Sequence, residues 1–339
     1  MVIFMKFPKF INKGDTIHLI SPSLGCSTEP YKTRLDNAIT FLRQNNELIL
    51  GDYVYQNINA LSSTPKNLGL EFENAYLSNS KFLLSVGGGE LQALILDYIN
   101  FEKIKNSTPK WFMGYSDNTN LCFALTVKCD VASIYGAHAP QFGYKVLDQS
   151  ILDNYDIMFG KKLSFDNYPK YELEQYEDPY LGLNLQYDSI ISTNENDKDI
   201  SFSGRIIGGC LDVLTTLVGT SYADLDSFNE KYKEDGIIWY LESCELNTMA
   251  VIRQLTHLKR NNWFKYVKGF IIGRPMLLND TSFGIDMKNA YIDTLKEFNV
   301  PIIYGADIGH INPSIPVING SICEVNYNNK KLNITYHLI

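Results

Sequence analysis

Apolar runs of strand length alternate with stretches of helical spacing over the first 160 residues. The β-rich runs cover residues 16–23, 81–90 and the start of 110–125. In residues 33–45, apolar side chains recur at i, i+3, i+4 and i+7 from Leu35, which predicts a helix with one buried stripe. Residues 91–99 and the end of 110–125 also predict helices. This alternation is typical of a parallel sheet covered by helices, an α/β domain.

The pattern weakens between residues 145 and 200, where a polar, tyrosine-rich stretch predicts loops that connect two domains. It resumes from residue 201 with β-rich runs and helical segments. We therefore predict an N-terminal α/β domain over residues 1–160, a connecting segment over 161–200 and a mixed α/β C-terminal domain over 201–339. Loops at the carboxyl ends of parallel strands form the binding crevice of such sheets.

Length and charge agree with two ordered domains. The chain has 339 residues, of which 45% are hydrophobic and 20% charged, so it can bury a sizeable core. Its formal net charge of −8 would repel a phosphate backbone, and no concentrated run of Lys or Arg counters this. We expect no nucleic-acid partner.

No stretch of the sequence predicts a membrane segment. Charges and a proline interrupt the apolar residues of 1–15, so we do not interpret them as a signal peptide. Elsewhere, no run approaches the ~20 apolar residues that span a bilayer. We expect a cytoplasmic enzyme without a membrane partner.

Six cysteines are scattered along the chain without a CxxC pair or another spacing typical of metal ligands. They are Cys26, Cys122, Cys129, Cys210, Cys244 and Cys323. Reduced, mostly buried thiols fit a cytoplasmic protein. We predict no metal and no cofactor.

The sequence MGYSDN at residues 113–118 is the strongest local signal. A serine on a sharp strand-to-helix turn exposes its hydroxyl to a substrate. The N–H of the next residue, Asp117, would then point to where an oxyanion forms. Gly114 permits the tight turn, although Asn118 stands where a second glycine is usual. Ser116 is either a nucleophile or a cap of the following helix, a role that Asp117 could also fill.

Gly87, Gly88 and Gly89 close another strand of the same predicted sheet. Without side chains, they allow backbone N–H groups to approach a ligand and to supply a second oxyanion donor. The loop lacks the glycine motifs of phosphate-binding and dinucleotide-binding loops. A plain tight turn is the alternative.

A serine nucleophile needs a base, and the chain offers five histidines. His18 and His337 lie in predicted strands and His257 lies in a predicted helix, where packed or surface positions are usual. His310 lies in the loop GADIGHINP, directly after a β-rich run, and loops of this kind carry function. His138, in the sequence YGAHAP, is the second candidate.

Glu242 ends the apolar strand that begins at Ile237. A carboxylate in this position needs a polar partner. The imidazole of a catalytic histidine would be one, and the carboxylate would fix its tautomer. A helix cap or a backbone partner is the alternative for Glu242, and the neighbouring Glu245 is a rival for the same role.

Seven segments, in this order, resemble the LD-carboxypeptidases, peptidase family S66, which also contains the microcin C self-immunity hydrolases. The segments are GDTIHLISPS, SVGGGE, FMGYSDNTNL, GRIIGGCLDVLTTLVGT, IIWYLESCE, GFIIGRP and PIIYGADIGHINPSIPVING. They extend over nearly the whole chain. The segments LESCE, GRP and GADIGH are closer to the microcin-immunity branch than to the wall-recycling enzymes.

The resemblance implies a serine carboxypeptidase-type hydrolase. It implies that Ser116 is the nucleophile, that Glu242 and His310 complete the triad, and that the N–H groups of Asp117 and Gly89 bind the oxyanion. It also implies an N-terminal domain like class I glutamine amidotransferases, a C-terminal domain of the LD-carboxypeptidase type, no metal and a homodimer.

The chain departs from the commoner family patterns at two positions. Glu90 follows a third glycine in SVGGGE, and Cys210 stands where asparagine is frequent. These differences concern the oxyanion loop and local packing, whereas the three triad positions are filled.

The mechanism implied is a two-step acyl transfer. His310 takes the proton of Ser116, the serine attacks an amide carbonyl, and water releases the acyl enzyme. A substrate carboxylate would need a cation near the cleft. Arg274 is our candidate for this cation, with a surface salt bridge as the alternative.

Two substrate classes follow from the resemblance: murein peptides with an amide bond between an L- and a D-residue, and aminoacyl or peptidyl nucleotides. An aromatic side chain stacked on a nucleobase would favour the second class. Tyr171, Tyr176 and Tyr180 of the connecting segment are candidates. A non-catalytic small-molecule or peptide-binding protein is a third hypothesis, against which the three filled triad positions argue.

Overall fold

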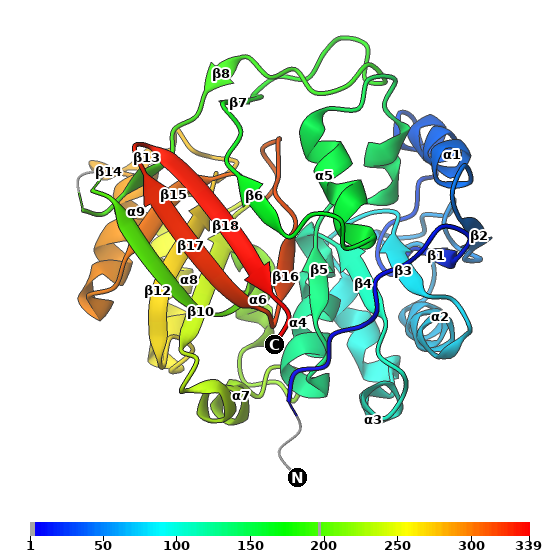
Figure 1. Cartoon of the computed structure of the whole chain (residues 1–339), viewed down its shortest axis with the longest axis horizontal. Coiled ribbons are helices and arrows are strands. Elements are labelled where there is room, and N and C mark those ends of the chain that lie inside the picture. Colours follow the sequence, from blue (N-terminus) through cyan, green and yellow to red (C-terminus); the bar gives the residue numbers. More distant parts are fainter. Residues whose placement is uncertain (1–3, 196–197) are drawn as a thin grey trace.

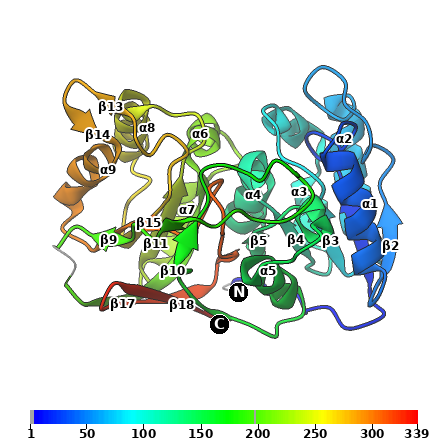
Figure 2. The ribbon, with the colours of Figure 1, turned by 90° about the horizontal axis from the view of Figure 1, so that it is seen from above.

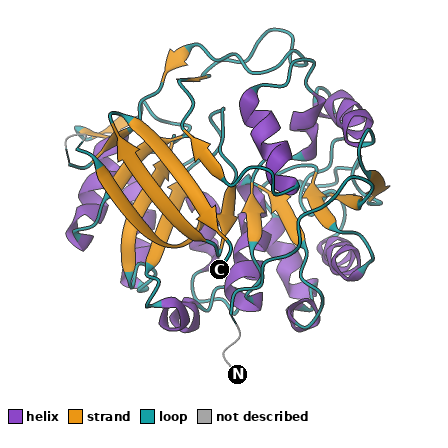
Figure 3. Ribbon diagram, viewed as in Figure 1, coloured by secondary structure: helices purple, strands orange, loops and turns teal. Residues whose placement is uncertain are grey.

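The computed structural model describes residues 4–195 and 198–339, and it contains two large β-sheets that lie side by side (Figure 1). Residues 1–3 of the predicted N-terminal domain and residues 196–197 of the predicted connecting segment lie outside the described part. Helices pack around both sheets (Figure 3). The chain therefore has the α/β fold that the alternation of strands and helices predicts.

The N-terminal sheet has six strands in the order β16-β5-β4-β3-β1-β2. They are β1 (Thr16–Ile20), β2 (Glu47–Leu50), β3 (Phe82–Ser85), β4 (Trp111–Gly114), β5 (Ser133–Tyr135) and β16 (Val317–Asn319). Neighbouring strands are parallel except for β16, which pairs antiparallel with β5. Every residue of β3 and β4 is buried, as expected for parallel strands covered on both faces.

The C-terminal sheet has eight strands in the order β6-β18-β17-β10-β11-β12-β15-β9. They are β6 (Ser164–Asp166), β9 (Ser192–Thr193), β10 (Ile200–Cys210), β11 (Ile237–Glu242), β12 (Val267–Gly273), β15 (Ile302–Ala306), β17 (Ile322–Asn328) and β18 (Lys331–His337). The inner strands β10, β11, β12 and β15 are parallel, and the outer strands pair antiparallel. The register pairs Cys210 with Glu242 and Gly273 with Ala306, so the residues that follow these strands meet at one edge.

The α-helices begin and end at local sequence signals. They are α1 (Tyr31–Leu42), α2 (Pro65–Leu77), α3 (Phe101–Lys105), α4 (Thr119–Cys129), α5 (Gln149–Met158), α6 (Leu211–Leu214), α7 (Leu225–Tyr232), α8 (Thr248–Arg260) and α9 (Met287–Leu295). At the start of α2, Thr64 accepts a hydrogen bond from the Asn67 N–H, and Pro65 occupies the first turn. Asn247 caps α8 in the same way. Among the described residues, no helix is long and apolar enough to cross a bilayer.

Short 3₁₀ helices and two-stranded ribbons complete the fold. They are η1 (Gln92–Tyr98), η2 (Ser116–Asn118), η3 (Ala139–Gly143), η4 (Thr215–Leu217) and η5 (Lys296–Phe298), with the ribbons β7 (Lys170–Tyr171) with β8 (Tyr187–Asp188) and β13 (Thr281–Ser282) with β14 (Ile285–Asp286). The segment 91–99 thus contains a 3₁₀ helix and not an α-helix. Its first residue, Gln92, donates its backbone N–H to Asp117 and its side-chain amide to Asn118, so contacts outside the segment fix its start.

The predicted connecting segment does more than join two sheets. Its strands β6 and β9 pair into the C-terminal sheet, and the part that carries β7 and β8 arches across the molecule between the two halves (Figures 1 and 2). In the other direction, β16 returns from the C-terminal part of the chain to the N-terminal sheet. Strand pairing therefore crosses the predicted borders at residues 160 and 200, and those borders stay predictions, as does the likeness of the N-terminal domain to glutamine amidotransferases.

Candidate active site

Ser116 stands on a sharp turn between β4 and α4. Its backbone has φ +62°, a left-handed conformation that residues other than glycine rarely adopt. Strained residues of this kind occur where the surrounding structure holds them for function. The Ser116 N–H donates a hydrogen bond to the Tyr135 hydroxyl at the end of β5, at 3.0 Å. The structure thus presents Ser116 on the type of turn that the MGYSDN sequence predicts.

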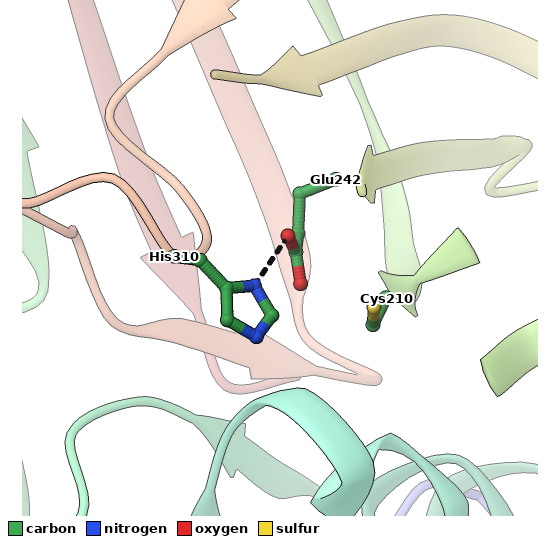
Figure 4. Close-up of side chains that lie close together, drawn as sticks. All are labelled: Cys210, Glu242 and His310. Atoms are coloured by element: carbon green, nitrogen blue, oxygen red, sulfur yellow. Dashed lines mark hydrogen bonds and ion pairs between the residues drawn. The ribbon is translucent and has the colours of Figure 1, made fainter. Parts of the chain in front are cut away.

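Three of the residues singled out in the sequence form one hydrogen-bonded chain. Ser116 Oγ lies 2.8 Å from His310 Nε2, and His310 Nδ1 lies 2.8 Å from Glu242 Oε2. Figure 4 shows the contact between His310 and Glu242. The serine comes from the N-terminal half and the other two residues from the C-terminal half, so the arrangement exists only where the halves meet.

The Glu242 carboxylate is completely buried at the end of β11. Its Oε2 contacts His310, and its Oε1 accepts a hydrogen bond from the Tyr135 hydroxyl at 2.5 Å. Burial alone would raise the pKa of Glu242, but the charge of His310 and hydrogen bonds from His310, Tyr135 and Cys210 lower it below its ordinary value. Glu242 is therefore held as a carboxylate.

The same pairing acts on His310 in the opposite direction. Burial is the largest single influence and lowers the pKa of this imidazole, but the charge and hydrogen bond of Glu242, together with Cys244, outweigh it and hold the pKa well above the usual 6.5. A carboxylate in this position favours the imidazolium that forms when the histidine accepts a proton. The electrostatics therefore match those of a general base.

Arg274 fixes the loop that carries His310. Its guanidinium is fully buried, forms an ion pair with Asp307, and donates hydrogen bonds to the carbonyls of Ile311 (3.0 Å) and Pro313 (2.6 Å). Arg274 does not line the cavity at Ser116. This corrects the expectation that Arg274 binds a substrate carboxylate, because Asp307 compensates its charge and the two carbonyls bind its Nη2 away from the cavity.

The Asp117 side chain ties the turn at Ser116 to the segment after β1 and to the start of η1. Its buried carboxylate accepts hydrogen bonds from the Ser23 hydroxyl (2.6 Å), the Gln92 N–H (2.9 Å) and the Asn120 amide (3.1 Å). Burial raises the pKa of this carboxyl, and these hydrogen bonds oppose the rise. The sequence predicted a role for the Asp117 N–H and missed the anchoring role of its side chain.

Gly88 and Gly89 both line the cavity at Ser116. A Cβ atom on Gly88 would lie 3.1 Å from Ser116 Oγ, so any larger residue would crowd the hydroxyl of the proposed nucleophile. A Cβ atom on Gly89 would lie 2.3 Å from the Ser23 hydroxyl. The glycine loop therefore packs directly against Ser116 at Gly88, and the role of the Gly89 N–H as an oxyanion donor stays a prediction.

The two alternative residues, His138 and Glu245, are not part of the hydrogen-bonded chain, although His138 lines the same cavity as Ser116. His138 stacks on Tyr115 with ring centroids 4.2 Å apart, and its Nε2 contacts the Tyr115 N–H (3.2 Å) and the Asn118 amide (3.0 Å). Burial lowers the pKa of His138 to about 3, so the ring stays neutral. Glu245 is exposed, and its backbone N–H binds Asp212.

A cavity of about 370 Å³ opens above Ser116 and His310. Its walls include Tyr31 and Arg34 of α1, Tyr144 after η3, Gln175 of the connecting segment and Asn312 of the histidine loop. Volumes of this order suit small ligands. Tyr171, Tyr176 and Tyr180 do not line it. The aromatic walls come from the N-terminal half and not, as expected, from the connecting segment.

Sequence reasoning missed Tyr135 and Arg34. Tyr135 ends an apolar run, and nothing local indicates that its hydroxyl reaches Glu242, 107 positions away. The position of Arg34 in the helical pattern could have been noticed in the sequence. Arg34 precedes Ala38 by four residues and thus lies on the buried face of α1, where a charged side chain needs a reason.

Cys210, Glu242 and His310 are the one group of three potential metal ligands within the described residues, with ligand atoms within 4.8 Å of one another. Figure 4 shows the Glu242 carboxylate between His310 and Cys210. Burial, with the charges of Glu242 and Asp212, raises the pKa of the Cys210 thiol well above 9. The protonated thiol donates a hydrogen bond to the Asp212 carboxylate at 3.4 Å and also helps to lower the pKa of Glu242, so the group is best interpreted as part of the Ser116 site.

Two family models match the chain. The LD-carboxypeptidase N-terminal domain matches residues 17–136, and the LD-carboxypeptidase C-terminal domain matches residues 203–325. The microcin C7 self-immunity protein MccF of Escherichia coli is 25% identical over 334 residues, covering 95% of this chain and 93% of MccF. YocD of Bacillus subtilis, which is named for a carboxypeptidase activity, is 24% identical over 319 residues, covering 93% of this chain and 94% of YocD.

Solved structures share the fold over the whole length. MccF in complex with glutamyl sulfamoyl guanosine superposes with a TM-score of 0.81 at 22% identity, covering 97% of this chain and 98% of MccF. An MccF-like protein from Bacillus anthracis superposes with a TM-score of 0.82 at 23% identity, covering 98% of this chain and all of the other. The chain therefore belongs to the LD-carboxypeptidase family, peptidase family S66, and is a hydrolase of the serine carboxypeptidase type.

Proposed function

We propose that Ser116, His310 and Glu242 are the catalytic triad of this hydrolase. The observation that supports the proposal is the continuous chain of 2.8 Å contacts from Ser116 Oγ through the imidazole to the buried Glu242 carboxylate. Its order is that of a nucleophile, a general base and the carboxylate that orients the base.

The geometry supports a two-step acyl transfer. His310 Nε2 accepts the proton of the Ser116 hydroxyl as Oγ attacks the carbonyl carbon, and the N–H groups of Asp117 and Gly89 stabilise the oxyanion. His310 then gives the proton to the leaving amine, and the acyl group stays on Ser116. Water, deprotonated by the same imidazole, releases the acid and restores the serine.

The substrate that we propose is the amide or acyl link of a small peptide or of an aminoacyl nucleotide. The relatives named as carboxypeptidases support the peptide. Solved MccF structures contain glutamyl sulfamoyl guanosine and aspartyl sulfamoyl adenosine, which supports the nucleotide. In this chain the rings of Tyr31 and Tyr144 in the cavity wall favour the second candidate, because each could stack on a base.

Mass spectrometry of reaction products tests both classes. The purified protein is incubated separately with an L,D-linked murein tetrapeptide and with an aminoacyl-sulfamoyl adenosine. Cleavage of one substrate alone assigns the class, and cleavage of neither favours the hypothesis of a non-catalytic binding protein.

The Ser116→Ala variant tests the triad. We expect its hydrolysis rate to fall by about 10⁴-fold or more, with an unchanged melting temperature, because the nucleophile is lost and the fold is not. Full activity in this variant would contradict the serine mechanism.

The homodimer stays a prediction from the resemblance, and the cytoplasmic location stays a prediction from the apolar pattern of the sequence. Light scattering on the purified protein tests the first, and fractionation of cells that produce the protein tests the second.

A further inference from the structure

Arg34 is a buried cation in the wall of the cavity that contains Ser116. It lies in the first half of α1, and its side chain is only 5% exposed. Its Nε donates to the carbonyl of Pro179 at 2.8 Å, and its Nη1 donates to the Tyr144 hydroxyl at 3.1 Å. Both partners are neutral, so neither of them compensates the positive charge of Arg34.

The two tyrosine rings of the cavity hold the guanidinium in place. Arg34 Cζ lies 4.5 Å from the centroid of the Tyr144 ring and 5.7 Å from that of the Tyr31 ring. Such cation–π contacts stabilise the charge and leave the edges of the planar group free. A guanidinium carries five N–H groups, and the bonds to Pro179 and Tyr144 use two of them.

Among the described residues, Arg34 differs from the other buried arginines, which each pair with a carboxylate. Arg205 pairs with Asp235, and Arg274 pairs with Asp307. Across residues 4–195 and 198–339, no carboxylate forms an ion pair with Arg34. The buried Glu172, whose charge acts on Tyr144, is bound instead by the Asn312 amide (2.7 Å) and the Asn184 N–H (2.9 Å).

A buried charge without a counter-charge is destabilising, and proteins keep such a group where a ligand supplies the missing partner. We propose that Arg34 binds an anionic group of the substrate, a carboxylate or a phosphate, through the N–H groups that Pro179 and Tyr144 leave free. Both anions match the planar, bidentate geometry of a guanidinium. This inference rests on the proposed function for its location beside Ser116, and it assigns to Arg34 the role that the sequence suggested for Arg274.

Binding measurements on the Ser116→Ala protein test the proposal without turnover. Calorimetry compares an L,D-linked tetrapeptide that ends in a carboxylate with the same peptide ending in a carboxamide, and AMP with adenosine. We expect the anionic member of one pair to bind on the order of 100-fold more tightly than its neutral counterpart. The pair that shows this preference identifies the anion as a carboxylate or a phosphate.

Substitution of Arg34 then locates the effect. In Arg34→Gln, added to Ser116→Ala, the preference for the anion should disappear while binding of the neutral ligand changes little. Arg34→Lys keeps the charge without the planar fork and should retain part of the preference. Arg43→Gln, an exposed arginine at the end of the same helix, is the matched control and should retain all of it.

Two results would overturn the proposal. One is the absence of any anion preference in the parent protein, which needs no folded variant to observe. The other is an equal loss of anionic and neutral binding in Arg34→Gln at an unchanged melting temperature, the result expected if Arg34 only holds Pro179 and Tyr144. Since neither measurement uses hydrolysis, a failure of the serine mechanism is recognised separately, by the activity of Ser116→Ala.

Discussion

The two halves of the molecule build their shares of the Ser116 site by different means. The N-terminal half uses backbone geometry: a serine in the left-handed backbone conformation and a loop of glycines that packs against it. The C-terminal half uses buried charge: Glu242 against His310, and Arg274 against Asp307 beneath the histidine loop. The contribution of the N-terminal half depends on the position in which the backbone holds Ser116. The contribution of the C-terminal half depends on the protonation states of Glu242 and His310.

This difference predicts different responses to substitution. Changes to the charged half should move the pH at which the enzyme works or the free energy of unfolding. Tyr135 connects the two halves, because its hydroxyl contacts the Ser116 N–H of one half and the Glu242 carboxylate of the other. A substitution of Tyr135 therefore tests how far the two halves act together.

The largest effect should follow Glu242→Gln. We expect kcat/KM to fall by about 10³- to 10⁴-fold, because the imidazole loses the carboxylate that orients it. The acid limb of the pH profile should also move. His310 acts as a base only when unprotonated, and Glu242 holds its pKa well above 6.5, so wild-type activity should rise with pH through a value above 6.5. Without the charge, burial dominates and the limb moves to lower pH. Rates measured from pH 5 to 10 test this.

Glu245→Gln is the control for this variant, since Glu245 is exposed and close in sequence. It should change kcat/KM by less than about twofold and leave the limb in place. An unmoved limb in Glu242→Gln would show that Glu242 does not set the protonation of His310.

The next largest effect should be on stability, in Arg274→Met. Removal of the cation leaves Asp307 buried without a counter-charge and leaves the carbonyls of Ile311 and Pro313 without their donor. We expect the free energy of unfolding to fall by about 3–5 kcal/mol, measured by urea denaturation.

Two further variants sharpen this prediction. Arg260→Met removes an exposed arginine at the end of α8 and should cost less than about 0.5 kcal/mol. Arg274→Met combined with Asp307→Leu removes both charges and should regain part of the loss. A loss below about 1 kcal/mol in Arg274→Met alone would mean that the ion pair does not hold the histidine loop.

The smallest effect should follow Tyr135→Phe. We expect kcat/KM to fall by about 10- to 100-fold, the range for one hydrogen bond to a charged group. The Tyr135 hydrogen bond stabilises the Glu242 charge and lowers its pKa. Its loss leaves more of that charge to act on His310, so the acid limb should move to higher pH, opposite to the shift in Glu242→Gln.

Tyr336→Phe controls for the loss of a buried hydroxyl. Tyr336 is buried and donates to the Pro316 carbonyl, at 3.0 Å. Tyr336→Phe should lower the free energy of unfolding by about as much as Tyr135→Phe does, but it should not shift the pH profile. A shift to lower pH in Tyr135→Phe would contradict the proposed link between the halves.

The same contrast explains what the sequence could predict. The geometry of turns and loops depends on a few adjacent residues, so the MGYSDN turn and the run of glycines were recognisable from the sequence. Glu242 and His310 were recognisable because a carboxylate ending an apolar strand and a histidine in a Gly- and Pro-rich loop are each unusual. The structure brings these residues into one hydrogen-bonded chain.

Pairings between distant residues were not predictable in this way. Arg274 follows a strand end and suggested a free cation, but Asp307, 33 positions away, compensates it. Arg34 lies in an ordinary amphipathic helix, and only the three-dimensional structure reveals that no carboxylate in the described part of the chain forms an ion pair with it. The segment 91–99 has helical spacing, yet its hydrogen bonds to Asp117 and Asn118 accompany a 3₁₀ helix.

The return of β16 to the N-terminal sheet has a consequence for biosynthesis. Val317 pairs with Tyr135, so the strand that covers the edge of β5 is translated after more than nine-tenths of the chain. Until then β5 presents unpaired backbone groups, and a nascent chain with such an open edge is prone to pair with other chains. The first half thus cannot complete its folding on the ribosome ahead of the second, and the last steps of folding should join both halves in one cooperative event.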